Sequence, residues 1–93
     1  MSKAGEQAEA MALRALAYIA GDEDRFSRFL LATGTTPEDV RQRVAEPDFL
    51  SGVIDYLLSD DALLIAFAED ASLDPSTVAV ARYSLPGAVM EPS

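Results

Sequence analysis

The chain has 93 residues, a formal net charge of −9 and an apolar content of 49%, which indicate one small globular domain and exclude a disordered chain. Cysteine and histidine are absent, which excludes disulfides, thiolate or imidazole metal ligands, and catalytic pairs built on those residues. The longest apolar run, Ala62–Ala68, is far shorter than the roughly 20 residues that span a bilayer.

Acidic residues gather in the second half of the chain. Residues 1–45 carry seven acids and six bases, whereas residues 46–93 carry nine acids and one base. Nucleic acids and anionic membranes repel such a segment, so we expect no membrane partner and consider nucleic acid disfavoured. The N-terminal residues 1–11 include acids where a signal peptide needs a basic region followed by an apolar one, so we expect a soluble cytoplasmic protein.

The first half predicts three helices. We expect residues 1–5 to be disordered and a first helix to run from Glu6 to Gly21, because apolar residues recur at three- and four-residue spacing. A second helix covers 22–34, where three acids favour a helix start. In the third, Thr36 can cap, Pro37 fits the first helical position and Asp39 suits a capping box.

The second half predicts three more helices. Pro47 disfavours helix at the preceding residue and begins a fourth helix (47–58), which has the clearest apolar stripe. Ser59 is expected to cap the fifth helix, which is apolar almost all round. Such a helix is either central in the fold or half of a partner interface, and we expect the central position. A sixth helix starts at Asp74-Pro75, so residues 6–85 form a single helical domain and 86–93 a loose tail.

A shift of 38 residues brings identical residues of the two halves together. The matched pairs fall on caps and core positions: Tyr18 and Tyr56, Asp22 and Asp60, Phe29 and Phe67, Pro37 and Pro75, Val40 and Val78. We therefore predict an all-α fold, a compact bundle of about six short helices arranged as two pseudo-repeated three-helix units. Two alternatives stay open: that small helical proteins simply reuse the same caps, and a five-helix fold with 37–45 reduced to a turn.

The leading functional hypothesis is a non-enzymatic protein–protein interaction module. The acidic second half and the apolar fifth helix would suit a basic protein partner or a second copy of the chain. The surface expected to take part comprises charged and apolar residues of both halves: Leu31, Arg41, Arg43, Asp60, Asp61 and Ile65. We assign no catalytic, cofactor-binding or metal-binding residue and expect no cofactor.

A small carboxylate- or metal-dependent enzyme is the first alternative. It would use Asp22, Asp60 or Asp61, since paired carboxylates bind divalent cations or transfer protons. These acids also open helices, where negative charge ordinarily stabilises the helix itself.

A helix-turn-helix-like nucleic-acid binder is the second alternative. The two helices joined by "LATGTTPEDV" hold four of the arginines: Arg25, Arg28, Arg41 and Arg43. Side chains of this kind contact phosphates and base edges. Two acids, Glu38 and Asp39, open the would-be recognition helix and weigh against this alternative.

Four motifs resemble a known family over residues 12–87. They are "FL-x-x-TG", "P-x-DV-x-x-R", "P-x-FL-x-x-V-x-DYLL-x-DD-x-LL-x-x-FA" and the closing "LPG". In these the chain resembles a bacterial domain-of-unknown-function family, number 3572, of short all-helical proteins. The resemblance implies a small size, a helical fold and an intracellular location, and it brings no catalytic residue with it.

Overall fold

The computed structural model describes residues 3–86, and every element in this range is a helix. The helices are α1 (Lys3–Ala20), α2 (Glu23–Thr33), α3 (Pro37–Arg43), α4 (Pro47–Leu58), α5 (Asp61–Ala71) and α6 (Pro75–Arg82). The prediction of an all-α bundle of six short helices is confirmed, with 37–43 a helix and not a turn. Residues 1–2 and 87–93, parts of the expected disordered start and loose tail, lie outside the described residues.

Helix starts follow the capping signals of the sequence, with two differences. At α3, Thr36 and Asp39 form a complete capping box, and Pro37 is the first helical residue. α1 begins at Lys3 and not at Glu6. The cap of α5 is Asp60 and not Ser59, because Ser59 instead ends α4 and its hydroxyl donates to the Tyr56 carbonyl at 2.7 Å.

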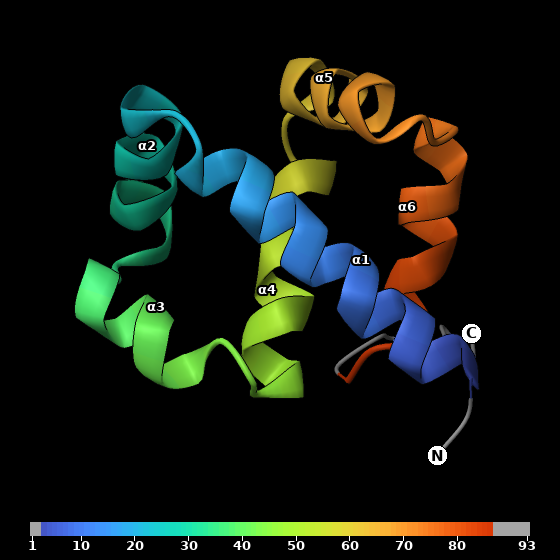
Figure 1. Cartoon of the computed structure of the whole chain (residues 1–93), viewed down its shortest axis with the longest axis horizontal. Coiled ribbons are helices and arrows are strands. Elements are labelled where there is room, and N and C mark those ends of the chain that lie inside the picture. Colours follow the sequence, from blue (N-terminus) through green and yellow to red (C-terminus); the bar gives the residue numbers. More distant parts are fainter. Residues whose placement is uncertain (1–2, 87–93) are drawn as a thin grey trace, which may run out of the picture.

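Helices α1 and α4 cross at the centre of the molecule, with α2 and α3 on one side and α5 and α6 on the other (Figure 1). Three fully buried alanines on one face of α1, Ala8, Ala12 and Ala15, present a smooth surface to the other helices. α4 buries larger side chains, among them Val53 and Ile54. Small residues on α1 therefore allow the close approach that makes these two helices the core.

The fifth helix lies at the edge of the fold, so the expectation that it would be central is wrong. Only Phe67 and Ala68 of α5 are buried, and Ile65 is 49% exposed. Hydrophobicity alone does not place a helix at the centre. The length of α1 and its stripe of small residues gave α1 and α4 that position.

The boundaries of the two halves repeat with a spacing of 38 residues. Both ends of α5 lie 38 positions after those of α2, and α6 starts 38 positions after α3. Each of α2 and α5 starts with an aspartate cap and ends at a residue in the left-handed region, Gly34 with φ 68° and Ser72 with φ 58°. The boundaries, caps and terminal conformations of α2 and α5 and the starts of α3 and α6 thus follow the predicted duplication, whereas α1 starts earlier than the shift from α4 requires.

Aromatic contacts between the two units are reciprocal. The ring of Tyr18 lies 5.8 Å from that of Phe67, and the ring of Phe29 lies 5.1 Å from that of Tyr56. A shift of 38 residues converts one pair into the other. When residue i contacts j and the equivalent of j contacts the equivalent of i, the two units pack as a two-fold related pair would.

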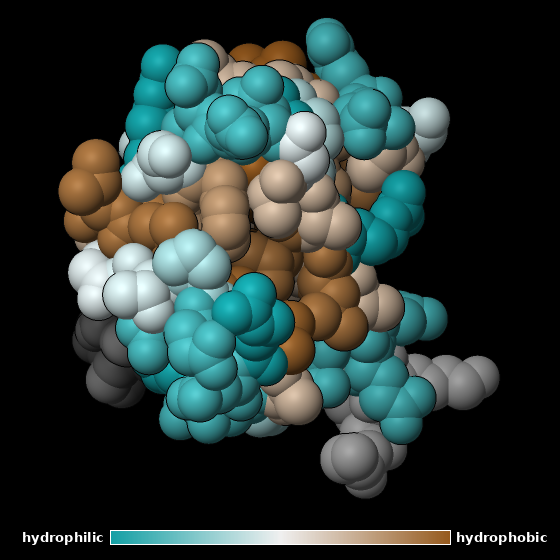
Figure 2. All heavy atoms as spheres, turned by 60° about the vertical axis from the view of Figure 1, so that its left-hand side comes forward, coloured by the Kyte–Doolittle hydropathy of each residue, from teal (hydrophilic) through white to brown (hydrophobic). Residues whose placement is uncertain are grey.

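Several hydrophobic side chains of the α2–α3 side remain partly exposed. Phe26, Leu30 and Val44 on this side are only partly buried against the core. A band of hydrophobic side chains crosses this face between hydrophilic regions above and below (Figure 2).

Candidate functional site

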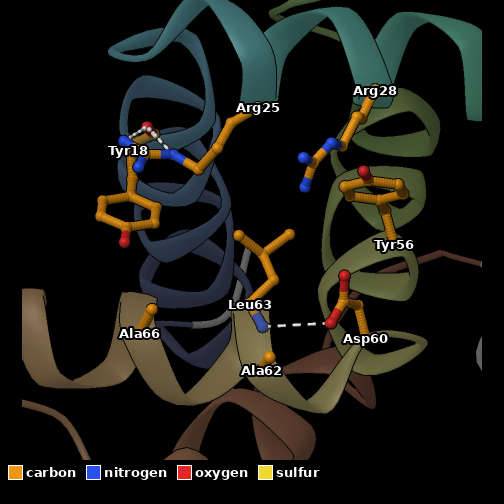
Figure 3. Close-up of a pocket in the computed structure, with 8 residues that line it drawn as sticks. All are labelled: Tyr18, Arg25, Arg28, Tyr56, Asp60, Ala62, Leu63 and Ala66. Atoms are coloured by element: carbon orange, nitrogen blue, oxygen red, sulfur yellow. Dashed lines mark hydrogen bonds between the residues drawn. The ribbon is translucent and has the colours of Figure 1, made fainter.

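A pocket of about 250 Å³ opens where the two units meet (Figure 3). Its walls come from α1, α2, the end of α4 and the start of α5. The lining residues are Tyr18, Arg25, Arg28, Tyr56, Asp60, Ala62, Leu63 and Ala66. Aromatic, basic, acidic and aliphatic side chains therefore share one small space.

The pocket lies at the junction that the duplication creates. Three pairs of its lining residues are 38 positions apart: Tyr18 and Tyr56, Arg25 and Leu63, Arg28 and Ala66. The tyrosines are the same in both units, but the arginines of α2 correspond to aliphatic residues of α5. The pocket consequently has a basic wall and an apolar wall, although the two units share one layout.

The Arg25 side chain already binds other groups of the protein. Its guanidinium carbon lies 4.0 Å from the centroid of the Tyr18 ring, and its Nη2 donates to the Tyr18 carbonyl at 2.8 Å. That carbonyl belongs to the last turn of α1, where backbone acceptors lack partners within the helix. Arg25 therefore fixes the corner between α1 and α2 and stacks on one wall of the pocket.

Arg28 differs from the other arginines of the described chain because its side chain forms no hydrogen bond or ion pair. The other five bind backbone carbonyls or carboxylates: Arg14, Arg25, Arg41, Arg43 and Arg82. Figure 3 shows the Arg28 guanidinium at the rim of the pocket, directed toward Tyr56. A guanidinium offers five donors in a planar fork, so all of them are available to a ligand.

Asp60 provides the acidic group of the pocket. One carboxylate oxygen, Oδ1, accepts from the Leu63 backbone N–H at 3.2 Å and caps α5. Within the described residues the other oxygen, Oδ2, has no hydrogen bond, and Figure 3 shows the carboxylate below the Tyr56 ring, with Arg28 above that ring. The two charged groups do not form an ion pair with each other.

The residues of the predicted interaction surface are spread over three helices, α2, α3 and α5. Leu31 is 84% exposed on α2. On α3, Arg41 pairs with Glu38 at 2.7 Å, and Arg43 pairs with its neighbour Glu46 at 3.2 Å. On α5, Asp61 and Ile65 lie on the exposed outer face, whereas Asp60 caps the helix and lines the pocket.

Two of the three acids considered for catalysis serve as helix caps. Asp22 accepts from the Arg25 backbone N–H at 3.0 Å, and Asp60 caps α5 in the same way. Within residues 3–86, no three acidic side chains gather closely enough to hold a metal ion. Asp61 lies in the first turn of α5, where its charge favours the helix dipole.

Two of the four arginines considered for nucleic-acid binding are paired with neighbouring glutamates. Arg41 and Arg43 pair with glutamates, and Arg25 is bound to the Tyr18 carbonyl. Among the arginines of α2 and α3, Arg28 therefore has neither an ion pair nor a hydrogen bond within the described residues, and it lines the pocket.

Sequence reasoning did not find the pocket. Tyr18 and Tyr56 were recognised as repeat equivalents, yet not as neighbours across one space. The sequence did hold one signal for the pocket: Arg28 of the first unit corresponds to an alanine, Ala66, in the second. A charged residue in only one of two repeated units marks a place where the units diverge.

Comparisons place the chain in a family without adding an activity. No curated protein and no solved structure matches it. None of the helices in the described part combines the length and the hydropathy needed to cross a membrane. The family model described as "Protein of unknown function (DUF3572)" matches residues 5–88, and the chain therefore belongs to that family.

Proposed function

We propose that this protein is a non-enzymatic interaction module that binds a basic protein segment on the outer face of α5. The observation that carries the proposal is the row Asp61, Ile65 and Glu69, which are four residues apart and all exposed. Residues at this spacing lie on one helix face. An exposed isoleucine is thus framed by two carboxylates on a helix at the edge of the fold.

The charge of this face selects the kind of partner. No ion pair neutralises the side chains of Asp61 and Glu69 within the described residues, and residues 46–93 carry nine acids against one base. Such a surface attracts basic segments over long range, while Ile65 offers apolar area for a short-range contact. A second copy carries the same charge of −9 and is repelled, so a basic partner is favoured over self-association.

A non-enzymatic role agrees with the residues at hand. The sequence has neither histidine nor cysteine, and the acids at Asp22 and Asp60 are used to cap helices. The proposal includes a cytoplasmic location, in keeping with the cysteine-free sequence.

Affinity capture at low and high salt tests the proposal. The immobilised protein should retain a basic protein at low salt and release it at high salt, because screening weakens exposed charge pairs. Capture should fall about fivefold or more in Ile65→Ser and in the double variant Asp61→Asn, Glu69→Gln, since interface anchors dominate binding.

Two variants serve as matched controls. Val80→Ser removes another exposed apolar residue, on α6, and Glu23→Gln removes the acid that corresponds to Asp61 in the first turn of α2. Both should capture the partner as the wild type does. The proposal fails if no basic protein is retained, or if the α5 variants retain it as well as the controls do.

A further inference from the structure

We propose that the pocket between the two units binds a small zwitterion, an α-amino acid with an apolar side chain. This inference is independent of the interaction module proposed above. The pocket uses Asp60, Leu63 and Ala66, whereas the proposed docking face uses Asp61, Ile65 and Glu69. Either site can be lost without the other.

Arg28 supplies the group that would bind a carboxylate. Its guanidinium is the one arginine head group in the described chain without a partner, and it lines the pocket. Guanidinium and carboxylate match as planar forks that form two parallel hydrogen bonds. Its counterpart in the second unit is Ala66, so no equivalent long side chain fills the opposite side of the space.

Asp60 decides between a simple anion and a zwitterion. A phosphate or a bare carboxylate held at Arg28 would share the pocket with the Asp60 carboxylate, while the second arginine of the lining, Arg25, directs its guanidinium to the carbonyl and ring of Tyr18. Like charges that share one small pocket repel each other. An ammonium group on the same ligand removes this conflict, because Oδ2 of Asp60 is free to accept its hydrogen bond. A zwitterion also has no net charge to be repelled during approach.

The rest of the lining suits an apolar side chain. The rings of Tyr18 and Tyr56 and the aliphatic residues Ala62, Leu63 and Ala66 form most of the remaining wall. The volume of about 250 Å³ lies below the range for drug-sized ligands, so it fits a molecule of amino-acid size. Ala62 and Ala66 are one helical turn apart on α5 and leave that side of the pocket open.

Chemical-shift titration of the ¹⁵N-labelled full chain tests this site, with L-leucine as the probe. We expect saturable shifts at Tyr18, Tyr56, Leu63 and Ala66. N-acetyl-leucine lacks the ammonium group, and leucinamide lacks the carboxylate. Each should bind at least about tenfold more weakly than L-leucine, because a charge-assisted hydrogen bond is lost. Inorganic phosphate should leave these signals unchanged.

Paired variants separate the site from the fold. Arg28→Gln and Asp60→Asn should each weaken L-leucine binding about tenfold, and asparagine keeps the capping ability of Asp60. Arg41→Gln and Asp22→Asn are the matched controls, since Asp22 is the equivalent cap outside the pocket. The proposal is overturned if L-leucine causes no saturable shift at millimolar concentration, if phosphate binds as well as L-leucine, or if the controls weaken binding equally.

Discussion

Aspartate side chains cap the starts of three helices in the described part of the chain, and Asp74 accepts two hydrogen bonds at the start of α6. Its Oδ1 accepts from the Ser76 backbone N–H at 2.9 Å and from the Ser76 hydroxyl at 2.8 Å. These hydrogen bonds favour the ionised form and lower the pKa of the Asp74 carboxyl below its ordinary value, and the bond from the Ser76 backbone has the larger effect. The charged form of Asp74 therefore caps the start of α6 more strongly than the neutral form does.

The lowered pKa of Asp74 predicts the direction of an acid effect. Because the folded-state pKa lies below the unfolded one, the stability that the carboxylate contributes is complete above about pH 4 and is lost as the pH falls through the folded-state pKa. The Asp74→Asn variant should lose less stability over this acid range than the wild type. A carbon-detected titration of the Asp74 carboxyl checks the cause, and a midpoint at or above about 3.9 would contradict it.

At the scale of the helix, the two units end α2 and α5 in the same backbone conformation with different residues. Gly34 and Ser72 both have positive φ, and Ser72 is the one residue other than glycine to do so in the described range. Glycine adopts this conformation without a steric penalty, whereas a side chain costs roughly 1 kcal/mol. Ser72 therefore stores a small amount of strain that its counterpart avoids.

Substitutions at Ser72 and Gly34 should change the free energy of unfolding in opposite directions. Ser72→Gly is expected to raise the free energy of unfolding by about 0.5–1 kcal/mol, and Gly34→Ala to lower it by about 1 kcal/mol. A Cβ at Gly34 would meet no atom within 4 Å, so the loss is conformational and not steric. Urea denaturation of both variants measures the difference, and a destabilised Ser72→Gly would contradict the account.

Helix boundaries were predictable because they depend on local chemistry. A cap, a proline and a glycine act within one turn, so the starts of α3, α4 and α6 could be read from Thr36, Pro47 and Asp74. The position of α5 was not predictable in this way. Whether Leu63 or Ile65 finds a neighbour depends on where other helices pass, and periodicity carries no such information.

The side chains of the pocket could not be predicted from the sequence for the same reason. Its residues come from four helices, and the free guanidinium of Arg28 depends on which acids lie within reach after folding. Glu38 could have been a partner for any nearby arginine, but it binds Arg41. The duplicated tyrosines were visible in the sequence, whereas the space between them exists only once the two units have packed.

For the whole molecule, the reciprocal contacts mean that each unit completes the core of the other. Phe29 of the first unit is fully buried, and its ring packs edge-on against Phe49 and Tyr56 of the second. Phe67 of the second unit packs in turn against Tyr18 of the first. A segment of half this length has too small a core of its own to fold stably.

The two halves should therefore fold only together. Peptides 1–45 and 46–93, each alone, are expected to show little helix by circular dichroism, and an equimolar mixture should recover the helical signal and a cooperative melt. Phe67→Ala in the second peptide should weaken their association by about 3–5 kcal/mol, the usual loss for a buried phenylalanine. Val80→Ser, an exposed position, should leave association unchanged. Native-like helix and a cooperative melt in either peptide alone would show that the units are separate domains, because an independent core needs no partner to cover Phe29 or Phe67.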